Sequence, residues 1–142
     1  MRDGRSKQKG SIGELAAMYE AAKRDYTVLT PHGDFSRYDF VVERGGKSER
    51  VQVKAVTPVD GVLEVPTRTM GFDNSQDTNN RSKQNKYSAD DFDWLIVYDL
   101  VNERCYFLPS SLTSDRAAVN LRLTPPKRKN PSVRMAVDFS NW

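Results

Sequence analysis

The stretch RYDFVVERGGKSERVQVKAV, residues 37–56, decides the fold because it reads as a β-hairpin closed by a two-residue turn. Residues 38–43 alternate between polar and apolar side chains, and residues 49–56 alternate again. Gly45 and Gly46 stand between them, and a two-residue hairpin turn needs backbone angles that glycine adopts without strain. The stretch therefore predicts two antiparallel strands of a sheet.

The turn decides which side chains share a face of this hairpin. With Gly45 and Gly46 at the turn, Asp39 lies opposite Gln52, and cross-strand neighbours of this kind have Cβ atoms about 4.5–5.5 Å apart. Lys54 leaves the same face as Gln52 because alternate residues of a strand point the same way. The other face carries an apolar set for the core: Phe40, Val42, Val51 and Val53.

The polar face of the hairpin suits phosphodiester hydrolysis. Oxygens of Asp39 and Gln52 are hard ligands of the kind that Mg²⁺ takes, together with waters and phosphate oxygens. Mg²⁺ would neutralise phosphate charge and acidify an attacking water, while Lys54 would hold that water or stabilise the transition state. The alternative is a solvent-exposed strand face on which these three residues have no catalytic role.

The rest of the chain predicts a single domain with one sheet. A helix is expected after Gly10, where Ser11 and Glu14 form a capping-box pattern, and apolar residues follow at helical spacing: Ile12, Leu15, Ala16, Tyr19 and Ala22. Strands are expected at 26–29, 62–67, 92–100, 104–108 and 133–139, a short helix at 110–121, a long polar loop at 71–86 and a proline-rich basic loop at 124–131. This order predicts an α/β fold with a central mixed β-sheet flanked by helices.

Composition limits the function classes. The chain has 142 residues and a net charge of +3, with basic clusters near both ends and around residues 81–86 that suit a polyanion. No apolar run is long enough to span a membrane, and the N-terminal stretch lacks the hydrophobic segment of a secretory signal. The single cysteine, Cys105, excludes an internal disulfide and fits a reducing cytoplasm.

Other site chemistries fit the sequence less well. His32 is the one histidine and Cys105 the one cysteine, so histidine-rich and zinc sites are excluded. No phosphate-binding glycine loop of the GxxxxGK[ST] type is present. Asp90, Asp91 and Asp93 precede a buried strand and are interpreted as a turn boundary rather than a cation site.

Several motifs resemble one nuclease superfamily. RYDF at 37–40, a short hairpin and RVQVK at 50–54 resemble the core of the PD-(D/E)XK nucleases, and KGSIGELAA at 9–17 resembles the start of that core. The resemblance is closest to the small group I intron homing endonucleases of the cyanobacterial type, which carry glutamine in the (D/E)XK slot. Tyr87, FDWLIVYD at 92–99 and YFLP at 106–109 are also similar. The match covers about residues 9–109, so 110–142 is interpreted as a C-terminal extension of one nuclease domain spanning 1–142.

The resemblance implies a restriction-endonuclease-like core and a role for each motif residue. It makes Asp39 the metal-binding aspartate, places Gln52 where a carboxylate usually stands, and makes Lys54 the motif lysine. Glu14 matches the glutamate of the first helix that approaches the metal, and it could replace the anionic ligand that Gln52 does not supply. The competing interpretation is that Glu14 caps its own helix. The implied cofactor is Mg²⁺, with Mn²⁺ able to substitute.

The predicted function is a metal-dependent, site-specific double-stranded DNA endonuclease of the homing type. The candidate DNA-binding residues are basic or amide side chains beside the hairpin, in the polar loop and at the N-terminus: Lys9, Arg37, Arg81, Lys83, Gln84 and Lys86. One subunit supplies one site, so cutting both strands implies a homodimer or tetramer. The alternatives are a structure-selective junction resolvase, an inactive DNA-binding protein on the same scaffold, and an interaction module without a nucleic acid partner.

Overall fold

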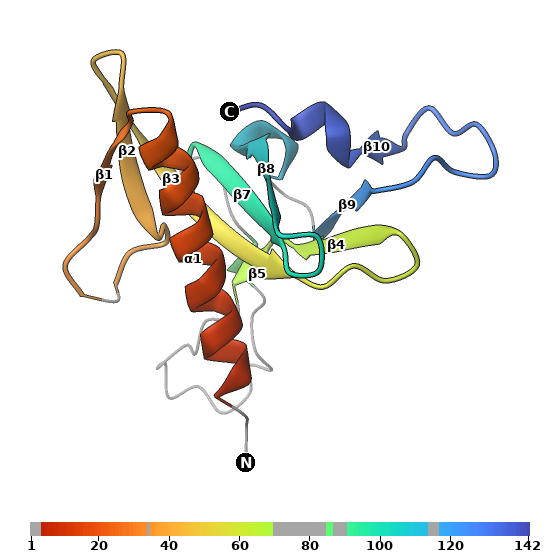
Figure 1. The fold of residues 1–142 in the computed structure, drawn as a ribbon, viewed down its shortest axis with the longest axis horizontal. Coiled ribbons are helices and arrows are strands. Elements are labelled where there is room, and N and C mark those ends of the chain that lie inside the picture. Colours follow the sequence, from red (N-terminus) through yellow and green to blue (C-terminus); the bar gives the residue numbers. More distant parts are fainter. Residues whose placement is uncertain (1–3, 34, 70–84, 87–90, 114–116) are drawn as a thin grey trace.

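The computed structural model describes residues 4–33, 35–69, 85–86, 91–113 and 117–142. In chain order the elements are α1 Arg5–Lys23, β1 Thr27–Leu29, β2 Phe40–Arg44, β3 Lys47–Val56, β4 Val62–Pro66, β5 Arg68–Thr69, β6 Asn85–Lys86, β7 Trp94–Asp99, β8 Arg104–Pro109, the 3-10 turn η1 Ser110–Leu112, β9 Ala118–Arg122, β10 Arg134–Met135 and the 3-10 turn η2 Ala136–Phe139. The α/β fold with a central mixed sheet is confirmed, with α1 crossing in front of that sheet (Figure 1).

The predicted hairpin forms the middle of the main sheet. The five strands of this sheet run in the order β1-β2-β3-β7-β8. Strand β2 pairs antiparallel with β3, from Phe40 opposite Val51 to Arg44 opposite Lys47. Gly45 and Gly46 have φ of 55° and 73°, the left-handed angles that the turn requires. β3 pairs parallel with β7, which makes β3 a central strand. The hairpin, its turn and its register within the ladder are therefore confirmed.

Helix α1 begins earlier than the capping box predicts. It starts at Arg5 and runs through Gly10 and Ser11, so neither Ser11 nor Glu14 caps its N-terminus, and that prediction is wrong. A glycine in a helix costs only about 1 kcal/mol relative to alanine, and nothing lies within 4 Å of a Cβ placed on Gly10, so the helix continues through it.

The helix packs on the sheet through small residues, not through the large apolar residues whose spacing predicted it. Gly13, Ala17 and Ala21 are its buried residues, and a Cβ built on Gly13 would lie 3.0 Å from the Cβ of Ala55 on β3. The core on this side contains Ala17, Ala21, Phe40, Val42, Val51, Val53, Ile96 and Phe107. Small side chains let the helix axis approach the sheet closely, which positions Glu14 beside the hairpin.

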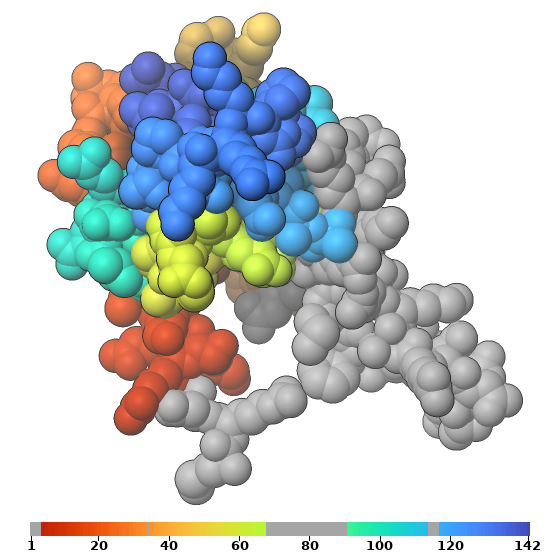
Figure 2. Space-filling model, turned by 90° about the vertical axis from the view of Figure 1, so that its right-hand side faces the viewer, coloured from red at the N-terminus to blue at the C-terminus, as the bar shows by residue number. Residues whose placement is uncertain are grey.

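The second face of the sheet is covered by a small β-sheet. The strands of this sheet run in the order β10-β9-β4, and its core side chains are Leu63, Val65, Val119 and Leu121. Figure 2 shows the segment from β9 to η2 lying against β4. The prediction of a short helix at 110–121 is wrong. Residues 118–122 form a strand in which Val119 and Leu121 are buried. In this part of the chain only Ser110–Leu112 is helical, as a 3-10 turn. Among the described residues α1 is the one α-helix, so a sheet covers the face where a second helix was expected.

The remaining predictions have mixed outcomes. The strands at 26–29, 62–67, 92–100 and 104–108 are confirmed as β1, β4, β7 and β8. The strand predicted at 133–139 is confirmed only for Arg134–Met135, since Ala136–Phe139 is a 3-10 turn. The polar loop predicted at 71–86 lies outside the described residues except at its end, where Asn85–Lys86 is a strand paired with β5.

Two further observations complete the fold. Trp142 stacks on Phe107 with ring centroids 5.0 Å apart, so the C-terminal segment returns to the α1 side of the main sheet and Trp142 serves in packing. Of the helices that the structure describes, none is long and apolar enough to cross a membrane.

Candidate active site

Asp39 lies where β2 separates from β3. The ladder ends at Phe40 opposite Val51, and the backbone N–H of Asp39 donates to Val51 O at 2.8 Å. The carboxylate of Asp39 then accepts the backbone N–H of Val53 at 2.7 Å. Asp39 is therefore not paired opposite Gln52, as the extended register predicted. Its side chain instead takes the hydrogen bond that β2 no longer supplies to β3, and this bond fixes the carboxylate at the sheet opening.

Glu14 approaches the same point from α1. Its carboxyl donates a hydrogen bond to the Asp39 carboxylate, and burial, the Asp39 charge and this bond together raise the pKa of Glu14 from 4.5 to about 7. Burial also raises the pKa of Asp39, against the lowering effects of the Val53 N–H, Glu14 and Lys54. Two carboxyl groups that share a proton are a site of concentrated negative potential once that proton leaves.

Lys54 and Gln52 lie on β3 on the face away from α1. They pair with Val97 and Leu95 of β7, whose side chains belong to the core between the two sheets. Lys54 is mostly buried, and burial lowers the pKa of its ammonium while the Asp39 charge opposes that shift. The described contact of Gln52 is a long bond of 3.5 Å from its Nε2 to Val53 O. The structure thus brings Glu14, Asp39 and Lys54 into interaction, with Gln52 two residues from Lys54 on the same face.

A polar hollow of about 320 Å³ opens over the two carboxyls. Its walls come from α1, from the chain after β1 and from the approach to β2: Glu14, Met18, Thr30, Pro31, Gly33, Ser36, Tyr38 and Asp39. Sequence reasoning had not placed Met18, Thr30, Pro31 or Gly33 at the site. They carry no motif, and only the packing of α1 against the main sheet brings these segments together.

The donor set fits one divalent cation of the magnesium type. Across the described residues no three His, Cys, Asp or Glu side chains lie together as a metal-binding group. Glu14 and Asp39 supply two carboxylates, whereas Gln52, which stands on β3 between Val51 and Val53, does not line the hollow. Mg²⁺ accepts such a set because it retains waters and phosphate oxygens in its coordination shell. Burial raises the pKa of both carboxyls, and the charge of Asp39 raises that of Glu14 further, so a bound cation would favour their ionised forms.

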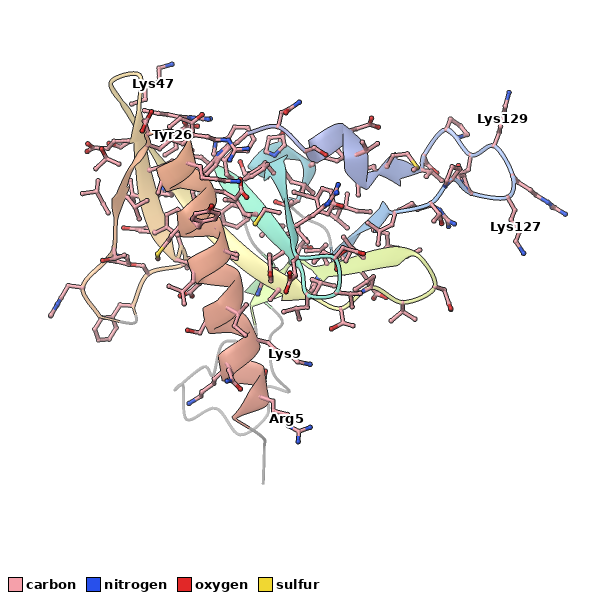
Figure 3. All side chains as sticks on the ribbon, viewed as in Figure 1. Arg5, Lys9, Tyr26, Lys47, Lys127 and Lys129 are labelled. Atoms are coloured by element: carbon pink, nitrogen blue, oxygen red, sulfur yellow. The ribbon has the colours of Figure 1, made fainter. Side chains whose placement is uncertain are left out.

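The candidate DNA-binding residues are placed unevenly. Lys9 is exposed on the N-terminal turns of α1, which Figure 3 shows extending past the sheets. Arg37 is exposed and pairs with Asp91 at 3.0 Å. Lys86 belongs to β6 rather than to a loop, and Arg81, Lys83 and Gln84 lie outside the described residues.

The aspartates before β7 and the single cysteine, which the sequence did not assign to the site, have structural roles where the structure describes them. Asp91 pairs with Arg37, and Asp93 accepts the backbone N–H of Arg50 at 2.7 Å, which supports the boundary role. Burial raises the pKa of Cys105 to about 12, so its thiol is not an activated nucleophile.

A mixed sheet with two carboxyls and a lysine gathered at the mouth of a β-hairpin is the arrangement expected of a nuclease on a restriction-endonuclease-like fold. The sequence profile of the PD-(D/E)XK endonuclease family matches residues 4–142. The chain therefore belongs to the PD-(D/E)XK endonuclease family and is a nuclease. Among solved structures it is similar to that of I-Ssp6803I, a bacterial homing endonuclease, with a TM-score of 0.73 and 27% identity over 94% of this chain and 87% of the other. No curated protein sequence matched the chain.

Proposed function

We propose that this protein is a Mg²⁺-dependent, site-specific endonuclease for double-stranded DNA, similar in activity to homing endonucleases. The observation that carries the proposal is the meeting of Glu14, Asp39 and Lys54 at one opening of the sheet, in a chain of the PD-(D/E)XK family. The similarity to a bacterial homing endonuclease over 94% of the chain supports the homing type. The lone, half-buried Cys105 supports a reducing cytoplasm as its location.

Glu14, Asp39 and Gln52 would hold the metal. When bound, Mg²⁺ neutralises phosphate charge and lowers the pKa of water. Asp39 is held rigidly by the 2.7 Å bond from Val53 N, so it needs little reorganisation to act as a ligand. Glu14, whose pKa is raised to about 7 by burial and by Asp39, would in its ionised form add the anionic charge that Gln52 lacks. These residues would form one site, with the carboxylates from α1 and the hairpin.

Lys54 would stabilise the negative charge that develops on the phosphate. Burial lowers the pKa of its ammonium, and the charge of Asp39 opposes that shift and favours the ammonium form. An ammonium held in a partly buried site interacts more strongly with developing charge than one in water does. A charged lysine is also a poor base, so this role is preferred to proton abstraction.

Cutting both strands requires two such sites. One chain supplies one pair of carboxyls, so we propose that the active form is a homodimer or a dimer of dimers on a pseudo-palindromic target. The DNA contacts would come from Lys9, Arg37 and the segment that contains Arg81, Lys83, Gln84 and Lys86.

The test is cleavage of a genomic DNA library in Mg²⁺ by wild type, Asp39→Asn and Lys54→Ala, with cut ends mapped by sequencing. We expect discrete ends from wild type alone. Lys54→Ala should keep its DNA affinity within a few-fold, because one contact among many contributes little to binding. Circular dichroism of each variant separates lost chemistry from lost folding.

Three other outcomes would redirect the proposal. Cleavage restricted to branched substrates would indicate a junction resolvase that reads DNA shape. Binding without cleavage in Mg²⁺ or Mn²⁺ would indicate a DNA-binding protein that has lost its catalytic metal site. Neither binding nor cleavage would indicate an interaction module.

A further inference from the structure

Helix α1 exposes its large apolar side chains. Ile12 is 44% exposed, Leu15 65% and Tyr19 64%, whereas the residues that pack on the sheet are Gly13, Ala17 and Ala21. Soluble monomers rarely display contiguous apolar patches without function, and such patches mark interaction surfaces. We call Ile12, Leu15 and Tyr19 the apolar stripe.

The apolar stripe follows one line along the helix. Its members are spaced by three and four residues, which places them on one side of an α-helix. Leu15 is two residues from both Gly13 and Ala17, or about 200° around the helix at about 100° per residue, so it points away from the sheet. Tyr19 has the same relation to Ala17 and Ala21. The stripe therefore lies on the side of α1 away from the sheet that this helix crosses in Figure 1.

We propose that the apolar stripe is the surface on which a second copy of this chain docks, with the two α1 helices packed antiparallel about a two-fold axis near Leu15. The stripe is self-complementary under this symmetry. Leu15 lies one residue from the midpoint of Arg5–Lys23, so the axis places Leu15 near its own copy and Ile12 near Tyr19 of the other copy. Isologous interfaces of a two-fold dimer have this property.

Charge along α1 favours the antiparallel arrangement. The N-terminal turns carry Arg5, Lys7 and Lys9. At the other end Glu20 pairs with Lys23 and Arg24, and Asp25 follows, so that end is balanced. Parallel packing would bring two sets of three cations together. Antiparallel packing brings each cationic end to a balanced end, where the helix carbonyls carry partial negative charge.

The arrangement also places the two catalytic sites together, and this step rests on the proposed function. Glu14 is about 100° around the helix from Leu15, so it points sideways from the line between the two helices. The two-fold axis of an antiparallel pair lies in the interface plane, perpendicular to both helices. Rotation about this axis leaves a side chain that points along it on the same side, so both Glu14 side chains lie on one side of the pair. Both hollows beside Asp39 would open on one side of the dimer, as cutting two strands of one duplex requires.

The contact surface sets the strength expected of this dimer. A 19-residue helix is about 28 Å long at about 1.5 Å per residue. One helix pair of that length buries less than the roughly 800 Å² per partner of a standard stable interface. The dimer should therefore be weak in the absence of DNA, and its test needs a method that captures transient contact.

Disulfide capture provides that test. In a Cys105→Ser background the only thiol is the introduced one. Leu15→Cys is compared with Val59→Cys, since Val59 is an equally exposed apolar residue at 68% outside α1. With mild oxidant and neither DNA nor metal, Leu15→Cys should form a covalent dimer roughly tenfold faster, because a disulfide needs Cα atoms within about 7 Å. Equal rates for the two variants would overturn the proposal.

Mixed cysteine variants test the orientation of the helices. Ile12→Cys mixed with Tyr19→Cys should give mainly the mixed dimer, whereas parallel helices would give mainly each variant linked to itself. Excess self-linked product would overturn the antiparallel packing.

Sedimentation equilibrium gives an independent measurement on the full chain. Leu15→Glu should lower self-association at least about tenfold relative to wild type and Val59→Glu, since a charge would be buried at the axis. A wild type that stays monomeric and does not cross-link would contradict the proposal even if it cuts DNA. Conversely, cross-linking through Leu15→Cys without nuclease activity under any condition would leave the dimer standing and refute the proposed function.

Discussion

Metal binding at the hairpin should depend steeply on pH because of Glu14. In the metal-free fold its pKa is about 7, raised first by burial and then by the charge and hydrogen bond of Asp39. A metal ion binds the carboxylate, so a proton on Glu14 competes with it. The sign follows directly: affinity for the metal rises with pH through the pKa of Glu14 and levels off above it.

The size of the effect follows from the ionised fraction. A carboxyl with a pKa of about 7 is about 9% ionised at pH 6 and about 91% ionised at pH 8. The apparent dissociation constant for the metal should therefore fall about tenfold between these two pH values, with about half a proton released per metal bound at pH 7. Glu14→Gln lacks the titrating group and should bind more weakly, with most of this dependence removed.

Isothermal titration calorimetry with Mn²⁺ measures both quantities. Titrations at pH 6, 7 and 8 give the affinity, and repeating the pH 7 titration in two buffers of different ionisation enthalpy gives the protons released. An affinity constant within twofold from pH 6 to pH 8 in wild type would refute the coupling between Glu14 and the metal. A full tenfold rise retained in Glu14→Gln would assign the coupling to another group, with Asp39 the first candidate.

Three further predictions concern the helix, the glutamine and the metal-free fold. Gly13→Ala should lower the free energy of unfolding in urea by about 1–3 kcal/mol, because its new Cβ would lie 3.0 Å from the Cβ of Ala55. Gly10→Ala, whose new Cβ would have nothing within 4 Å, should raise it by about 0.5–1 kcal/mol. Equal effects of the two variants would disprove the close packing of the helix at Gly13. Gln52→Glu should fold normally and lower the metal concentration needed for cleavage, and an unchanged requirement would indicate that Gln52 is not a ligand. In EDTA the melting temperature should fall as pH rises from 5 to 8, because Glu14 holds its proton more tightly in the folded state than in the unfolded state. Glu14→Gln should flatten this decline. A decline in Glu14→Gln as steep as that of wild type would contradict the assignment to Glu14.

Much of the hairpin could be read from the chain because its signals are local. Gly45 and Gly46 set the turn, alternation set the buried face, and the ladder from Phe40 opposite Val51 to Arg44 opposite Lys47 follows from both. The order of side chains along one strand likewise placed Gln52 and Lys54 on one face, since strand geometry has a period of two residues.

The start of α1 and the fold of the C-terminal segment were not readable from local signals. Ser11 and Glu14 match a capping box, yet the helix continues back to Arg5, because a local motif does not exclude a longer helix. Residues 118–122 were predicted to be helical but form a strand. Their partner is β4, more than fifty residues earlier, and such pairing leaves little mark on local sequence. Val119, Leu121 and Ala136 from the segment predicted to be an extension pack in the core between the two sheets.

The sequence by itself determined the hairpin, the pairing of its strands and the residues that the site could use. Tertiary structure alone decided that Asp39 leaves the ladder to accept the N–H of Val53, and that Glu14 meets it from α1 instead of capping the helix. It also decided that α1 packs through Gly13, Ala17 and Ala21 and exposes its larger apolar side chains. The physical reason is that helical spacing shows which residues share a side, while the close approach of the helix to the sheet, set by residue size, decides which side is buried.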